Sequence, residues 1–241
     1  MTWLVVLFAS FCAGCIQSAT GFGGAIIMMQ FFPHFLGMVA SPALVGAITL
    51  LLSTSLAWRF RRHIHWPTVL FPTALYILVN TAAINLVRSV NLDLLTAAFG
   101  AFMVVLAVYF MLFAGKFTFR PSWRSASLCA ALSGCTAGFF GIGGPLMALY
   151  FVTAAKDKET YLANLQFLFV ASNTCSLCTR VLNGIYTPAL IPLTLLGFVG
   201  IFLGKKWGLK LLDKLDIDRM KKIIYILVGI SGLLTLLKQI F

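Results

Sequence analysis

A short glycine-rich pattern occurs twice in the chain, and it limits the possible folds more than any other feature. The first copy runs from Gly14 to Gly24 and reads GCIQSATGFGG, and the second runs from Gly134 to Gly144 and reads GCTAGFFGIGG. The opening Gly-Cys and the closing Gly-x-Gly-Gly fall in register, about 120 residues apart in a chain of 241. The spacing indicates two fused copies of one structural unit, roughly residues 1–115 and 121–241.

The composition is that of a membrane protein. Hydrophobic residues make up 61% of the sequence and charged residues only 10%, whereas soluble domains carry about 25% charged residues. Ten apolar segments can be read, and most approach the roughly 20 residues that a helix needs to cross a bilayer. The second and seventh are shorter and follow the Gly-x-Gly-Gly sequences, so they could be short crossing helices or halves of re-entrant hairpins. The segments cover roughly residues 3–20, 22–36, 40–58, 67–87, 92–113, 125–140, 143–155, 160–182, 188–204 and 219–240.

Lysine and arginine residues are unevenly distributed between these segments. Alternate connections hold 15 of the 18 basic residues, and the positive-inside rule therefore places these connections in the cytoplasm and both termini outside. Each half has an odd number of segments, so the second half would enter the membrane from the opposite side. We therefore expect one all-α polytopic membrane domain over residues 1–241, with two inverted repeats that each contain a broken glycine-rich helical hairpin plus three transmembrane helices. Parallel repeats with four crossings per half would instead place the most basic connection outside.

The two Gly-x-Gly-Gly sequences are expected to interrupt helices. Each glycine costs roughly 1 kcal/mol of helix stability relative to alanine. A helix that begins after such a break presents free N–H groups and the positive end of its dipole, which together favour anions. Two such helix starts, contributed by inverted halves, would converge near the bilayer midplane and form a substrate site. The alternative is that the glycines only allow helices to pack closely.

Polar side chains near these glycines could complete an anion site. Hydroxyl and amide groups can donate hydrogen bonds to the oxygens of an anion, although in membrane helices they also bond to their own backbone or to neighbouring helices. Cys15 and Cys135 correspond in the repeat, and we consider a thiol role at the site for this pair. The candidate substrate-binding residues are Gln17, Ser18, Thr20, Gly21, Gly23, Gly24, Thr136, Gly141, Gly143, Gly144, Asn173 and Thr174.

Acidic residues are absent from the interior of every apolar segment, because all six fall in connections or at segment ends. Cation sites and proton relays in membranes usually depend on buried carboxylates, so the sequence favours an anionic or neutral substrate. No nucleophile–base set, zinc-ligand cluster or phosphate-binding loop accompanies the repeats, and we expect neither an enzyme, a bound metal nor a cofactor. The net charge of +12 fits cytoplasmic connections beside a lipid bilayer rather than a nucleic-acid partner.

Both copies of the motif resemble those of the sulfite exporter TauE/SafE family, also called the toluene-sulfonate uptake permease family. The sharper match is Gly138–Gly144, and the likeness covers the whole chain in length and layout. The resemblance implies transport of small sulfur-containing or organosulfonate anions, such as sulfite, thiosulfate or a sulfonate, across the bacterial inner membrane. The site residues that it carries over are Gly21, Gly23, Gly24, Gly141, Gly143 and Gly144.

Three functions stay open on the sequence alone. The leading hypothesis is a secondary transporter that binds a small anion between the two glycine-rich helix breaks. An anion channel could use the same helix ends, and a non-transporting membrane assembly protein could use the glycines purely for packing.

Overall fold

The computed structural model describes residues 2–113 and 121–212, and within these ranges the chain is helical without any strand. The prediction of an all-α fold is confirmed for this part of the chain, while the tenth predicted segment, residues 219–240, lies outside it. The α-helices are α1 (Thr2–Thr20), α2 (Gly24–Phe31), α3 (Pro33–Phe60), α4 (Trp66–Leu86), α5 (Leu92–Phe113), α6 (Trp123–Phe140), α7 (Gly144–Ala154), α8 (Lys158–Leu182) and α9 (Ile191–Leu212). Short 3₁₀ turns are η1 (Arg61–His63), η2 (Val87–Ser89) and η3 (Pro188–Leu190).

Four of the described helical stretches are long and apolar enough to cross a membrane. They are Thr2–Thr20, Pro33–His63, Trp66–Leu86 and Pro188–Leu211. The helices α2 and α7 have only 8 and 11 residues. At 1.5 Å per residue they measure about 12 and 17 Å, well short of a hydrocarbon layer of roughly 30 Å. Neither helix that follows a Gly-x-Gly-Gly sequence can therefore cross the membrane by itself.

Two pairs of helices pack with their backbones very close together. In the α1–α9 pair, a Cβ added to Gly14 would collide with the carbonyl oxygen of Ile201. In the α4–α6 pair, a Cβ added to Gly134 would lie 2.6 Å from the carbonyl oxygen of Tyr76. Small residues permit this approach, and van der Waals packing of this kind holds membrane helices together. The first glycine of each motif copy thus serves helix packing.

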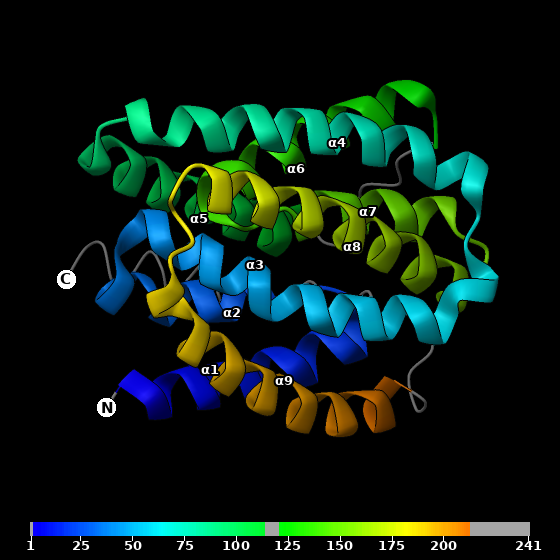
Figure 1. Cartoon of the computed structure of the whole chain (residues 1–241). Coiled ribbons are helices and arrows are strands. Elements are labelled where there is room, and N and C mark those ends of the chain that lie inside the picture. The colour runs from blue at the N-terminus through cyan, green and yellow to red at the C-terminus, as the bar shows by residue number, and fades with distance from the viewer. Residues whose placement is uncertain (1, 114–120, 213–241) are drawn as a thin grey trace.

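Helices α3 and α8 pack against each other at the centre of the molecule and run in opposite directions (Figure 1). The backbone N–H of His65, just beyond the end of α3, donates to Oδ1 of Asn164 near the start of α8 at 2.9 Å. Farther along α8, Nδ2 of Asn173 donates to Oγ1 of Thr49 at 3.4 Å, and Thr49 lies earlier in α3. The two contacts therefore fix an antiparallel crossing.

Basic side chains gather at the end of the bundle where α3 joins α4. Nζ of Lys205 in α9 donates to Oγ of Ser55 in the last part of α3. The bond between His65 and Asn164 brings the start of α8, with Lys158, to the same end. These contacts place described parts of three basic connections on one side, as the positive-inside rule requires of connections that share a compartment.

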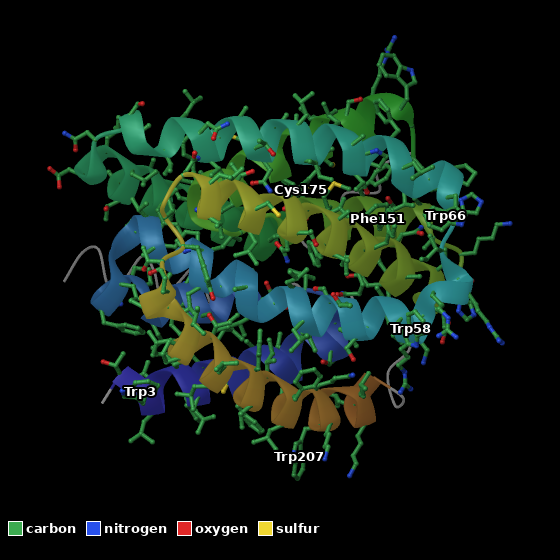
Figure 2. The ribbon with its side chains drawn as sticks, in the orientation of Figure 1. Trp3, Trp58, Trp66, Phe151, Cys175 and Trp207 are labelled. Carbon is green, nitrogen blue, oxygen red and sulfur yellow. The ribbon has the colours of Figure 1, made fainter. Side chains whose placement is uncertain are left out.

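Exposed tryptophans mark both ends of the bundle. Trp58 and Trp66 lie at the end that carries the basic residues, and Trp3 lies at the opposite end (Figure 2). Tryptophan is enriched where a membrane protein meets the headgroup region, because its ring is apolar and its N–H is polar. The distribution fits a bundle whose long axis crosses the bilayer.

Candidate functional site

The two glycine motifs form turns at which a helix ends and a short helix begins. Helix α1 ends at Thr20, Gly21 and Gly23 have φ values of 89° and 96°, and α2 starts at Gly24. Helix α6 ends at Phe140, Gly141 has a φ of 70°, and α7 starts at Gly144. Positive φ angles are readily adopted only by glycine, so the sequence allows the chain to turn at these points.

The first turn packs on α8 and the second turn packs on α3. A Cβ on Gly21 would lie 2.9 Å from a methyl carbon of Leu162 in α8, and a Cβ on Gly141 would lie 3.0 Å from Cβ of Pro42 in α3. Gly21 and Gly141 are 120 residues apart, and so are Pro42 and Leu162, so the two contacts are reciprocal. The turns also meet each other, because a Cβ on Gly144 would lie 3.1 Å from Cβ of Phe22.

Side chains of α8 bind carbonyl groups that the first turn leaves without a helical partner. The hydroxyl of Tyr161 donates to the carbonyl of Thr20 at 2.8 Å, and Nε2 of Gln166 donates to the carbonyl of Gly21 at 2.5 Å. Irregular backbone at membrane depth is tolerated only where protein or water satisfies it in this way. Both side chains are therefore occupied in holding the turn.

A cavity lies between the two turns and the central helices. The space not filled by atoms is about 570 Å³, counting the part that opens to solvent. Its glycine border consists of Gly23 from the first turn, Gly46 from α3, and Gly141, Gly143 and Gly144 from the second turn. Its polar border includes Gln17, Tyr76, Asn80, Asn173, Ser176 and Arg180. Backbone of both repeated motifs thus meets polar side chains of α1, α4 and α8 around one space.

Arg180 is the cationic residue of this cavity. It lies in the last turn of α8, and only 2% of its surface is exposed. Nη2 donates to the carbonyl of Gly138 at 2.7 Å, with a longer approach of 3.5 Å to Ala137, and Nε donates to Oγ of Ser176 at 3.4 Å. Nη1 is buried and has no hydrogen-bond partner among the described residues. The guanidinium therefore links α8 to the last turn of α6 and keeps one nitrogen unused.

Acidic side chains lie away from this cavity throughout the described part of the chain. Asp93 and Asp157 are exposed, and Glu159 is half-exposed beside Lys158, with 3.9 Å between the charged atoms. Asp157 caps α8 by accepting a hydrogen bond from the backbone N–H of Thr160 at 2.7 Å, and this bond holds the pKa of its carboxyl below the ordinary value. Within residues 2–113 and 121–212, no carboxylate borders the cavity and its positive charge is not balanced there.

A family model described as sulfite exporter TauE/SafE matches residues 6–235 of the chain. The chain belongs to this family. The match covers nearly the entire sequence, so it confirms the resemblance that the two glycine motifs indicated. No curated protein and no solved structure matches the chain. Members of the TauE/SafE family are membrane transporters, and transport of sulfite or a related anion is the activity that membership implies.

In this TauE/SafE chain, six of the twelve candidate substrate-binding residues border the cavity. Gln17 is buried, and its Nε2 donates to Oγ of Ser53 at 3.0 Å. Asn173 reaches the cavity from the centre of α8. The candidates that line the cavity are Gln17, Gly23, Gly141, Gly143, Gly144 and Asn173.

The other candidates lie outside the lining, and the three threonines among them have a local partner. The hydroxyls of Thr20, Thr136 and Thr174 donate to carbonyls three or four residues earlier in their own helices, at 2.8, 3.1 and 2.7 Å. Serine and threonine commonly do this in membrane helices. The candidates outside the lining are Ser18, Thr20, Gly21, Gly24, Thr136, Thr174 and the cysteines Cys15 and Cys135.

The sequence interpretation overlooked Arg180, Ser176, Tyr76 and Asn80. Arg180 stands near the end of the predicted segment 160–182, and the structure places it in the last turn of α8, on the inner face of that helix. The available signal was spacing, because Asn173, Ser176 and Arg180 recur at intervals of three and four residues, which puts them on one helix face. Tyr76 and Asn80 are likewise four residues apart in α4.

Proposed function

We propose that this chain transports small sulfur-containing or organosulfonate anions, such as sulfite, thiosulfate or a sulfonate, and that the substrate binds in the cavity between the two glycine turns. Family membership supports the activity. The observation that carries the proposal to this cavity is that glycines of both motif copies border it together, Gly23 from the first and Gly141, Gly143 and Gly144 from the second.

The residues that line the cavity favour a small anion. The first residue of α7, Gly144, borders the cavity, so the positive end of that helix dipole lies beside the substrate. Amide groups of Gln17, Asn80 and Asn173 offer hydrogen-bond donors to oxyanions. The border has no described carboxylate that would repel negative charge. A sulfite or sulfonate group would thus exchange its hydration shell for backbone and amide dipoles.

We further propose that the chain is one membrane domain of two inverted repeats, residues 1–115 and 121–241. Exchanging each helix with its counterpart converts the α1–α9 contact into the α6–α4 contact, and the contact of Gly21 with Leu162 into that of Gly141 with Pro42. The counterparts α3 and α8 are antiparallel, which is what a two-fold axis in the membrane plane requires. Transporters with inverted repeats bind substrate near the midplane at the interface of the halves.

Alternating access would follow from motion of the α1–α9 pair and the α4–α6 pair relative to each other around this cavity. The close α1–α9 and α4–α6 pairs each join helices of different halves, so each pair would move as a unit while the contacts between pairs change. The described basic connections lie at one end of the bundle. On the positive-inside rule, we place that end on the cytoplasmic side of a bacterial inner membrane.

Flux measurements in liposomes test this proposal. Anionic liposomes that contain the purified protein are expected to take up radiolabelled sulfite, thiosulfate or methanesulfonate faster than protein-free liposomes. Unitary currents at channel rates would favour the anion channel instead. Absence of uptake for all three anions would contradict the proposed function and leave the packing role for the glycines.

A further inference from the structure

We propose that Arg180 is the counter-charge for the transported anion, binding one of its oxygens through Nη1. The inference rests on the proposed function and adds to it the residue that neutralises the substrate. Neither the glycine motif nor the family match singles out this residue, which lies some 40 positions beyond the second turn.

Burial without a counter-ion is the first observation that supports this role. A guanidinium stays charged in proteins, and removing it from water is costly unless a partner of opposite charge replaces the water. Arg180 is 98% buried, and its described partners are two neutral carbonyl groups and one hydroxyl. An anion in the adjoining cavity would supply the missing negative charge.

The second observation is that the nitrogens of Arg180 differ in their hydrogen-bond partners. Nη2 and Nε are used to bind the last turn of α6 and Ser176, whereas Nη1 is buried without a partner among the described residues. An unsatisfied buried donor raises the free energy of the folded protein, so a purely structural role does not account for Nη1. The contacts to α6 hold the guanidinium in place in the wall of the cavity.

The third observation is the position of Arg180 relative to the second turn. It donates to the carbonyls of Ala137 and Gly138, which immediately precede Gly141, Gly143 and Gly144. The cation and the start of α7 therefore border one cavity, and both favour negative charge. A small oxyanion with two or more oxygens can contact both at once, whereas chloride offers a single atom.

Sulfite binding to the purified full chain tests this assignment. Substitution Arg180→Gln is expected to weaken sulfite affinity by about tenfold or more, because a charge-assisted hydrogen bond is lost. Arg180→Lys, which keeps the charge but not the fork of donors, should be intermediate. The control is Arg62→Gln, which removes an exposed charge at the end of the bundle and should leave affinity unchanged. Affinity is read from the sulfite dependence of the thermal midpoint, and initial uptake is measured in parallel.

Two outcomes separate this inference from the proposed function. If folded Arg180→Gln binds and transports sulfite as the wild type does, the inference fails while transport by this chain stands. If the wild type neither binds nor carries sulfite, thiosulfate or methanesulfonate, the proposed function fails and the inference falls with it.

A measurement on the wild type covers the case in which the Arg180 variants do not fold. The purified protein is treated with phenylglyoxal, an arginine reagent, and modified peptides are quantified by mass spectrometry. Arg180 is buried and reacts only when the cavity opens, so sulfite bound in the cavity is expected to slow modification of Arg180 and not of the exposed Arg62. Equal modification of Arg180 with and without sulfite would overturn the inference.

Discussion

Gly143 illustrates how a single methyl group decides whether the turn between α6 and α7 can form. Its φ of −119° is accessible to any residue, so its requirement for glycine comes from space rather than from backbone conformation. An added Cβ would collide with the hydroxyl of Tyr76 and lie 2.7 Å from the carbonyl oxygen of Ser133 and 2.8 Å from Cβ of Ala137. Two of these neighbours belong to α6, so the turn could not close against its own helix.

Substitution Gly143→Ala is therefore expected to destabilise the protein by roughly 1–3 kcal/mol, the usual cost of overpacking, and to reduce sulfite uptake. The matched folding control is Gly46→Ala, because Gly46 borders the same cavity but an added Cβ meets nothing within 4 Å. Thermal denaturation in detergent compares the two. Equal midpoints would show that Gly143 is not sterically confined.

Asp157 offers a test of local stability that is independent of transport. Its N-cap bond to Thr160 lowers its pKa below 3.8, so the stabilisation is present at neutral pH and is lost as the pH falls through that lowered pKa. Asp157→Ala is expected to cost roughly 0.5–2 kcal/mol, whereas Asp157→Asn should keep the cap and lose its dependence on pH. Thermal midpoints measured from neutral to acidic pH check this, and an unchanged acid dependence in the Asn variant would disprove it.

Sequence patterns located some cavity residues and missed others for physical reasons. Gly23 and Gly143 were found because the motif repeats, and Gln17 because a buried amide inside an apolar segment needs partners. Arg180 was missed because its burial depends on α6, a helix some 40 residues away in the sequence. Thr136 was a candidate although its hydroxyl donates to its own helix, because the sequence does not tell whether a hydroxyl turns to its own helix or to a cavity.

At the scale of elements, the antiparallel crossing of α3 and α8 determines where the two turns lie. The rings of Trp66, at the start of α4, and Phe167, in α8, are 5.1 Å apart in an edge-to-face arrangement. This contact holds the start of α4 on α8, and the bonds of His65 to Asn164 and of Asn173 to Thr49 fix the register of the α3–α8 crossing. Because each turn packs on one of these helices, a shift in register would separate the two sides of the cavity.

Cross-linking tests this register. A double variant with Trp66→Cys and Phe167→Cys is expected to form an intramolecular link with a short bifunctional thiol reagent. The control pairs Trp66→Cys with Leu182→Cys, because Leu182 is exposed at the far end of α8. Comparable yields from both pairs would contradict the antiparallel arrangement. The native cysteines are replaced beforehand so that they do not react.

The sequence predicted the bounds of several helices closely. Apolar length and the glycine motifs placed α1, α4, α6 and α7 within a few residues of their observed bounds. The gap between the second and third predicted segments, residues 37–39, coincides with a kink inside α3, where Gly37 has a φ of 75° and a ψ of 172°. The sequence did not show that this helix already starts at Pro33, before the kink.

At the scale of the whole molecule, the basic residues orient the chain in the membrane. Described parts of three basic connections lie at one end of the bundle, where Lys205 reaches Ser55 and where Lys158 begins α8. We expect this end to face the cytoplasm and both termini to face outward. A reporter fused after Phe241 should therefore be active only outside the cytoplasm, and a cytoplasmic signal would rule out the five-plus-five inverted arrangement.

Counterflow tests transport by alternating access most directly. Liposomes containing the purified protein are preloaded with unlabelled sulfite and diluted into buffer with a trace of labelled sulfite. A transporter with one cavity that opens to either side exchanges the two, so the label inside should rise transiently above its equilibrium level and then fall. Gly143→Leu, which fills the turn, should abolish this overshoot. A wild type that takes up label only to equilibrium, without overshoot, would contradict the alternating mechanism and point to a channel.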